Sequence, residues 1–153
     1  MDLERWMEEA LALAREAGEA GEVPVGCVVV REGAVIGRGR NRREEEKSAL
    51  AHAELEAIRE ACGRLGDWRL TDCALFVTLE PCAMCAGAIL NARLPVVVYG
   101  LREGRTGACG SVLDLFSENF GFHPRMYGGV REAECRKLMG EFFSDLRRDE
   151  VST

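Results

Sequence analysis

The stretch Val77-Thr78-Leu79-Glu80-Pro81-Cys82-Ala83-Met84-Cys85 decides the fold class of this chain. Its apolar first part belongs to a run from Ala74 to Leu79 that is typical of a β-strand. Pro81 suits the first turn of a helix, where its missing N–H costs nothing, so a short helix is expected from Cys82 to Ala92. A strand that leads directly into a helix is a unit of layered α/β domains.

The flanking sequence continues this alternation of strands and helices. Further elements are expected as helices at 3–18, 50–63, 112–116 and 131–148, a hairpin of strands at 25–30 and 34–39, and a strand at 94–99. In the helix at 50–63, we expect Leu55, Ile58 and Ala61 on the buried side. Residues 40–48 and 121–129 are expected to be irregular. No repeat or linker divides the chain, so residues 1–153 are predicted to form one α/β domain.

The composition is that of an ordinary globular protein. With 153 residues, 47% hydrophobic and 30% charged, the chain can bury a core without disulfide support. No apolar run approaches the ~18 residues of a membrane span. The acidic, amphipathic start does not resemble a targeting peptide, so a cytoplasmic location is expected. The seven cysteines are an odd number, which disfavours a disulfide scaffold.

The net charge of −6 is distributed unevenly along the chain. Residues 1–22 hold seven acidic residues against two arginines, whereas residues 31–43 hold five arginines against one glutamate. Phosphate binding depends on the local field more than on the total charge. The acidic total therefore does not exclude a nucleic-acid partner, and a solvated surface loop is an equally good interpretation of the arginines.

Two short motifs supply the ligands of a metal site. His52 contributes an imidazole, Cys82 and Cys85 contribute thiolates at i, i+3 spacing on one helix face, and Glu54 adds a carboxylate. Zinc prefers four tetrahedral ligands of these types, and a catalytic zinc keeps one position for water. The spacing H-x-E followed by P-C-x-x-C is typical of zinc-dependent nucleobase deaminases. We therefore expect a catalytic zinc that activates water, with Glu54 carrying protons between the water, the base and the departing amine.

Two other interpretations of the motif are open. Cys73 or Cys109 could complete a structural zinc site as a fourth ligand, or the cysteines could pack in a fold without metal.

The chain also resembles the bacterial tRNA-specific adenosine deaminases of the cytidine deaminase-like superfamily. The resemblance covers roughly residues 3–148 and is carried by segments at 23–26, 40–41, 51–54, 77–88, 106–111, 141–143 and 147–148. It implies a three-layer α/β/α fold with a mixed five-stranded sheet flanked by helices. It also implies conversion of the wobble adenosine of a tRNA anticodon to inosine, by a homodimer with one zinc ion per subunit and no DNA partner.

The resemblance assigns roles to individual residues. His52, Cys82 and Cys85 would be zinc ligands and Glu54 the proton shuttle. The substrate-binding residues would be Asn41, Pro24, Val25 and Glu103. Glu103 stands where the family commonly has aspartate, and His123 stands in a Phe-His-Pro triplet where the family has Asn-His-Arg.

Three functions are compatible with the motifs. The first is tRNA adenosine deamination, with arginines 40, 42 and 43 and those at 102–105 facing phosphates. The second is deamination of a free base or nucleoside of the guanine or cytosine type, which the acidic total charge favours. The third is a zinc-binding interaction protein without catalysis.

Overall fold

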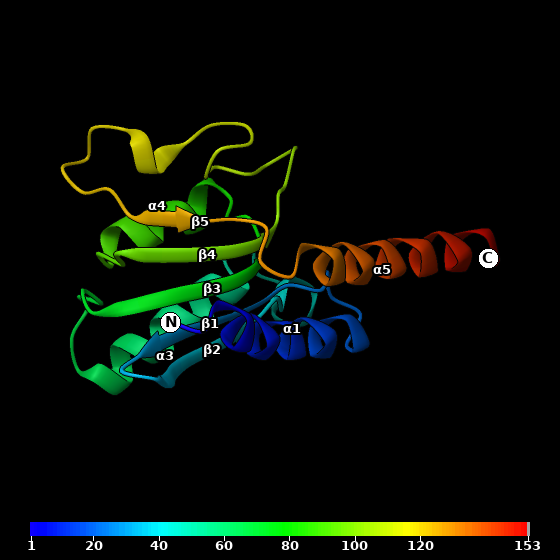
Figure 1. Cartoon of the computed structure of the whole chain (residues 1–153). Coiled ribbons are helices and arrows are strands. Elements are labelled where there is room, and N and C mark those ends of the chain that lie inside the picture. Colours follow the sequence, from blue (N-terminus) through cyan, green and yellow to red (C-terminus); the bar gives the residue numbers. More distant parts are fainter. Residues whose placement is uncertain (153) are drawn as a thin grey trace.

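The computed structural model describes residues 1–152 and shows helices on both faces of a five-stranded sheet (Figure 1). Its elements are α1 (Leu3–Glu19), β1 (Gly26–Arg31), β2 (Ala34–Arg40), α2 (Arg43–Glu46), α3 (Ala53–Leu65), β3 (Cys73–Leu79), α4 (Ala83–Asn91), β4 (Val96–Leu101), the 3-10 turn η1 (Leu115–Ser117), β5 (Arg125–Tyr127) and α5 (Glu132–Ser152). No described helix is both long and apolar enough to cross a membrane.

The sheet is mixed, with strand order β2-β1-β3-β4-β5. β1 runs antiparallel to β2 and β3, whereas β3, β4 and β5 are parallel. The predicted mixed five-stranded sheet is thus confirmed. Because β3 and β4 are parallel and pair up to Leu79 and Leu101, the segments that follow both strands leave the same edge of the sheet. At this carboxyl-terminal end of the two strands, Cys82 therefore lies close to the loop that follows Leu101.

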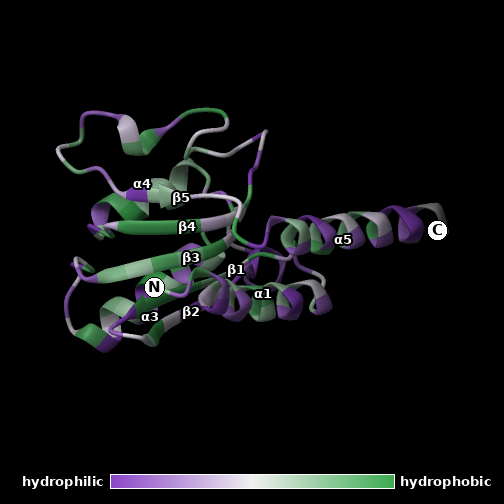
Figure 2. Ribbon diagram, in the orientation of Figure 1, coloured by the Kyte–Doolittle hydropathy of each residue, from purple (hydrophilic) through white to green (hydrophobic). Residues whose placement is uncertain are grey.

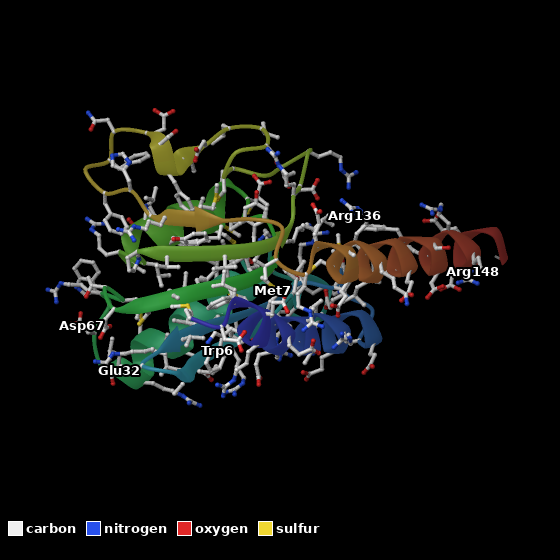
Figure 3. All side chains as sticks on the ribbon, in the orientation of Figure 1. Trp6, Met7, Glu32, Asp67, Arg136 and Arg148 are labelled. Atoms are coloured by element: carbon white, nitrogen blue, oxygen red, sulfur yellow. The ribbon has the colours of Figure 1, made fainter. Side chains whose placement is uncertain are left out.

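Two hydrophobic cores lie on opposite faces of the sheet, which gives the three layers. Successive strand residues point to opposite faces, so Val29 and Leu75 pack in the core under α3 and α4, while Val28 and Phe76 pack in the core under α1 and α5. The apolar colouring of β3 and β4 in Figure 2 agrees with this double burial. On α1, the labelled Met7 of Figure 3 is completely buried.

Glycine and alanine bring α3 unusually close to β2. A Cβ atom on Gly39 would overlap the carbonyl oxygen of Ala53, and one on Gly37 would overlap that of Ala57. The buried face of α3 is therefore the i, i+4 row of Ala53, Ala57 and Ala61. The expectation is confirmed for Ala61, which is fully buried, and for Ile58, which packs against the core although it is only partly buried. It was wrong for Leu55, which is partly buried beside this row and is not a member of the core.

The side chain of Glu60 connects α3 to the outer edge of β2. β2 is an edge strand, and the backbone N–H of Arg38 donates to Glu60 Oε1 at 3.0 Å.

Two elements lie in segments that were expected to be irregular. The short helix α2 forms at 43–46, where the buried carboxylate of Glu22 accepts hydrogen bonds from the backbone N–H groups of Glu44 and Glu45 at 3.0 and 2.8 Å. The three-residue strand β5 forms because it pairs with β4, with Val97 opposite Met126. Both elements depend on contacts from distant parts of the chain.

Candidate active site

His52, Cys82 and Cys85 meet at the carboxyl-terminal end of β3, where α3 and α4 begin. His52 is the N-cap of α3 and Cys82 the N-cap of α4, one position before the helical turns in which they were expected. Both have extended backbone, and neither side chain caps its own helix. The imidazole and the thiol are therefore left available for each other. Cys85 follows in the first turn of α4 and is completely buried.

The spacing of these three groups fits a zinc ion. His52 Nδ1 lies 3.7 Å from Cys82 Sγ and 3.4 Å from Cys85 Sγ, and all three ligand atoms lie within 4.8 Å of one another. Tetrahedral zinc with ordinary Zn–N and Zn–S bonds separates such atoms by about 3.6 Å. The donor set of one imidazole and two sulfurs is also one that zinc prefers.

Cys73 and Cys109 do not join this group among the described residues. Cys73 lies at the opposite end of β3, beside Asp72. Cys109 belongs to the loop that follows β4, and its side chain is buried in the core. The described residues therefore offer three ligands at this point, whereas a closed structural zinc site uses four.

Glu54 is buried beside the three ligands. Burial raises the pKa of its carboxyl to about 7, although the nearby His52 acts in the opposite direction. The pKa of Cys82 is lowered to about 3, first because Cys85 donates a hydrogen bond to its sulfur, and also because His52 does so. The same contact with Cys82 raises the pKa of Cys85. The site therefore holds a thiolate ready to bind a cation and a carboxyl able to exchange a proton near neutral pH.

A pocket of about 450 Å³ opens over these groups. Its volume falls in the usual range for small-molecule and base-binding sites. The pocket is lined by Val23, Val25, Asn41, Arg43, His52, Ala53, Glu54, Leu79, Glu80, Cys82, Glu103, Arg105, Thr106, Met139 and Phe143. The structure thus brings Asn41, Val25 and Glu103 together with Glu54 and the ligands. Their contact with substrate remains a prediction.

Pro24 does not lie at this pocket. It is buried in a separate hollow between α1 and α5, beside Leu138 and Phe142. Pro24 is the middle residue of a tight turn in which the backbone N–H of Val25 donates to the carbonyl oxygen of Val23 at 2.9 Å. Val23 and Val25 line the pocket, while Pro24 lines the other hollow. Pro24 was predicted to bind substrate near the pocket wall; that wall is lined by its neighbours Val23 and Val25, and contact of Pro24 with substrate remains a prediction.

Asn41 is fixed in place by its own amide. Its Oδ1 accepts from the backbone N–H of Arg43 at 3.1 Å, and its Nδ2 donates to the carbonyl oxygen of Val23 at 3.3 Å. A primary amide has two N–H groups and two acceptor positions. One donor and one acceptor of Asn41 therefore remain for a bound base.

Most arginines near the pocket are already engaged within the chain. Arg40 is buried and pairs with Glu45 at 3.0 Å, and Arg42 pairs with Glu45 and Glu56, each at 2.9 Å. The prediction that Arg40 faces a phosphate was therefore wrong, because its side chain is buried against Glu45. Arg42 is partly exposed, and its contact with a phosphate remains a prediction. Arg43 and Arg105 are exposed and line the pocket.

His123 lies outside the pocket lining, with its Nδ1 2.7 Å from the carbonyl oxygen of Phe116. Glu80, Met139 and Phe143 are lining residues to which the sequence motifs assigned no role. For Glu80 a signal was present, because a carboxylate directly follows a buried strand and precedes the first cysteine ligand.

Comparisons with known proteins agree with this site. The family model of the MafB19-like deaminases matches residues 1–147. The tRNA-specific adenosine deaminase of Bacillus subtilis is 44% identical over 146 residues, covering 95% of this chain and 91% of that protein. The tRNA(Ile)-lysidine synthase of Deinococcus radiodurans is 49% identical over 148 residues, but the chain spans only 25% of its length.

A solved structure is also similar. It comes from a study of A-to-I editing by tRNA:A34 deaminases at the wobble position of transfer RNA. It superposes with a TM-score of 0.84 and 45% sequence identity, covering 88% of this chain and 98% of that one.

Proposed function

Since the chain belongs to the MafB19-like deaminases and to the tRNA-specific adenosine deaminases, we propose that it hydrolyses the wobble adenosine of a tRNA anticodon to inosine, releasing ammonia. The observation that carries this proposal is the convergence of His52, Cys82, Cys85 and Glu54 at one pocket of base-binding size.

We infer that His52, Cys82 and Cys85 hold one zinc ion per subunit. Their mutual distances and the chemistry of the donors support this. When bound, zinc supplies an activated water, because it lowers the pKa of that water to about 7.

The protein's own contribution is proton transfer by Glu54. Burial raises the pKa of its carboxyl above that of a free glutamate, which makes the carboxylate a better acceptor for a proton of the attacking water and a donor of that proton in the next step. Delivery of that proton to a ring nitrogen of adenine makes the amino-bearing carbon electrophilic. The hydroxyl that has added to this carbon then gives up the second proton of the water, which Glu54 carries to the amino group. The C–N bond breaks, ammonia leaves, and the water oxygen is retained as the new carbonyl.

We infer that Asn41 and the apolar wall orient the base. The free donor and acceptor of Asn41 can pair with the edge of a purine, while Val23, Val25 and Phe143 supply apolar contact. Sequence-specific RNA recognition commonly uses unpaired, splayed-out bases of this kind. Arg43 and Arg105, at the pocket rim, are the arginines placed to contact the flanking phosphates.

We propose that the protein acts as a cytoplasmic homodimer that binds RNA and not DNA. The outer face of α4 supports dimerisation, because the helix carries no charged residue and leaves Ala83 exposed and Met84 partly exposed. Light scattering on the wild type and on Met84→Arg tests this, since a charge placed in an apolar interface should produce monomers.

The proposed activity is tested with purified protein, zinc and anticodon stem-loops. The expected result is inosine from the RNA with adenosine at the wobble position and no reaction with guanosine there or with a DNA stem-loop. A panel of free guanine, cytosine and nucleosides is run in parallel. Ammonia from that panel, with none from the stem-loop, would contradict the proposal and favour a free-base deaminase. Activity should also fall steeply with salt, as expected for phosphate binding.

A further inference from the structure

The buried carboxylate of Glu80 lies at the centre of the loop that follows β4. Its Oε1 accepts hydrogen bonds from the backbone N–H of Glu103 at 3.1 Å and from the hydroxyl of Ser111. Its Oε2 accepts from the backbone N–H groups of Cys109 and Ser111 at 3.0 and 3.1 Å. Only 3% of the residue is exposed. Four donors from residues 103–111 thus converge on one carboxylate.

The parallel pairing of β3 and β4 places this carboxylate inside the loop. The backbone N–H of Glu80 donates to the carbonyl oxygen of Leu101 at 2.8 Å, and that of Ala108 donates to the carbonyl oxygen of Pro81 at 2.9 Å. Gly107 leaves room for the carboxylate, because a Cβ atom there would overlap it. The loop therefore folds around Glu80 and against the segment that carries Cys82.

Three side chains of the same loop line the pocket: Glu103, Arg105 and Thr106. Glu103 is the residue whose backbone Glu80 holds, and its own side chain in turn accepts a hydrogen bond from the N–H of Arg105 at 3.0 Å. Arg102 ties the far end of the loop, with bonds to Gly110 and Ser111. The chain of contacts runs from Glu80 through Glu103 to the pocket rim.

We propose that Glu80 is a positioning residue, which sets the substrate-facing side of the 103–111 loop relative to the cysteine ligand Cys82. The proposal rests on the deaminase function proposed above. Glu80 acts through Glu103 and has no part in the proton transfers themselves. Its loss should therefore weaken RNA binding more than it slows the chemical step.

Glu80→Gln makes a specific prediction. An amide keeps one acceptor oxygen, so it retains the two backbone bonds from Cys109 and Ser111 only if its nitrogen replaces Oε1. With the glutamine nitrogen in the place of Oε1, the Ser111 hydroxyl can rotate and accept a hydrogen bond from it. The backbone N–H of Glu103 is only a donor, so it faces the donor N–H group of the glutamine and loses its partner. The variant should release the Glu103 amide while the amides of Cys109 and Ser111 stay protected.

The experiment combines hydrogen exchange with steady-state kinetics on the zinc-loaded enzyme. For Glu80→Gln we expect faster hydrogen exchange at the amide of Glu103 and full zinc content. The KM for the stem-loop should rise about tenfold because one charge-assisted hydrogen bond is lost, while kcat should stay within about twofold of the wild-type value. Asp114→Asn is the matched control. It also weakens a carboxylate-to-backbone bond, to Phe116 at 3.1 Å, but outside the pocket, and should leave KM unchanged.

A double-mutant cycle with Glu103→Ala separates positioning from general destabilisation. If Glu80 acts through Glu103, the two substitutions together should raise KM no more than Glu103→Ala alone. Additive effects, or a fall in kcat with KM unchanged, would overturn the proposal. If Glu80→Gln does not fold, Ser111→Ala removes the hydroxyl with its bonds to Glu80 and Arg102 but keeps the three backbone donors on Glu80, and it should raise KM about twofold to threefold; an unchanged KM would also overturn the proposal. Hydrogen exchange needs no turnover. It therefore tests whether Glu80 positions the loop even if the protein proves to have no activity on the stem-loop.

Discussion

Substituting Gly39 with alanine tests the close contact between β2 and α3. The added methyl would overlap the carbonyl oxygen of Ala53, and it would stand 2.8 Å from the backbone nitrogen of Ala57 and 2.9 Å from Cβ of Glu56. Ordinary contacts between heavy atoms begin near 3.5 Å, so α3 must move away by about 1 Å. Overpacking costs about 1–3 kcal/mol, and we expect the upper value, about 3 kcal/mol, because helix backbone cannot rotate aside as a side chain can.

The same displacement should reach the metal site. His52 precedes Ala53 directly, and metal sites tolerate ligand errors of only about 0.2 Å. We therefore expect Gly39→Ala to bind zinc at least about tenfold more weakly, measured by competition with a chelator, in addition to the loss of stability measured by urea unfolding. Gly63→Ala is the control on the outer side of the same helix, where a Cβ meets nothing within 4 Å. It should stabilise the protein by about 0.5–1 kcal/mol. If Gly39→Ala unfolds at the urea concentration of the wild type and retains its zinc, the reasoning is refuted.

Three further predictions concern the metal, the proton shuttle and pH. Glu54→Gln should lower kcat by about 10²- to 10⁴-fold while metal analysis still finds one zinc per chain; retention of activity would exclude the assigned role. Removing zinc with a chelator should lower the melting temperature of the wild type, because the metal binds only the folded state, whereas His52→Ala should respond little. Asp72 has a pKa below its ordinary value of 3.8 because Arg31 donates to it at 2.7 Å. Its contribution to stability is therefore present above about pH 4 and is lost as the pH falls further. The stability difference between wild type and Asp72→Asn in urea unfolding should accordingly disappear in acid, and a difference that persists would contradict this.

The metal site could be predicted from sequence because its ligands depend on local spacing. Cys82 and Cys85 are three residues apart at the start of a helix, and His52 stands at the start of another, so short-range geometry determines most of the arrangement. The strands β3 and β4 were similarly evident from continuous apolar runs, which are typical of buried parallel strands.

Features that depend on distant contacts could not be predicted in this way. The buried side of α3 follows the glycines of β2, so its alanines are buried more deeply than the larger Leu55 and Ile58. The position of Glu80 inside the 103–111 loop results from the register of β3 against β4, which no local pattern encodes. Similarly, net charge along 31–43 does not reveal that Glu45 and Glu56 neutralise Arg40 and Arg42.

The bond between the N–H of Arg38 and the Glu60 carboxylate has a consequence for self-association. An edge strand with unpaired N–H groups is a template on which strands of other molecules can add, which leads to open-ended aggregation. Glu60 occupies one of these donors on β2 and sets a negative charge beside it, which blocks regular strand addition at that point. The opposite edge, β5, is only three residues long and offers little to pair with. Growth of the sheet from one molecule into the next is therefore disfavoured at both edges, which favours association of copies through their helices and loops instead.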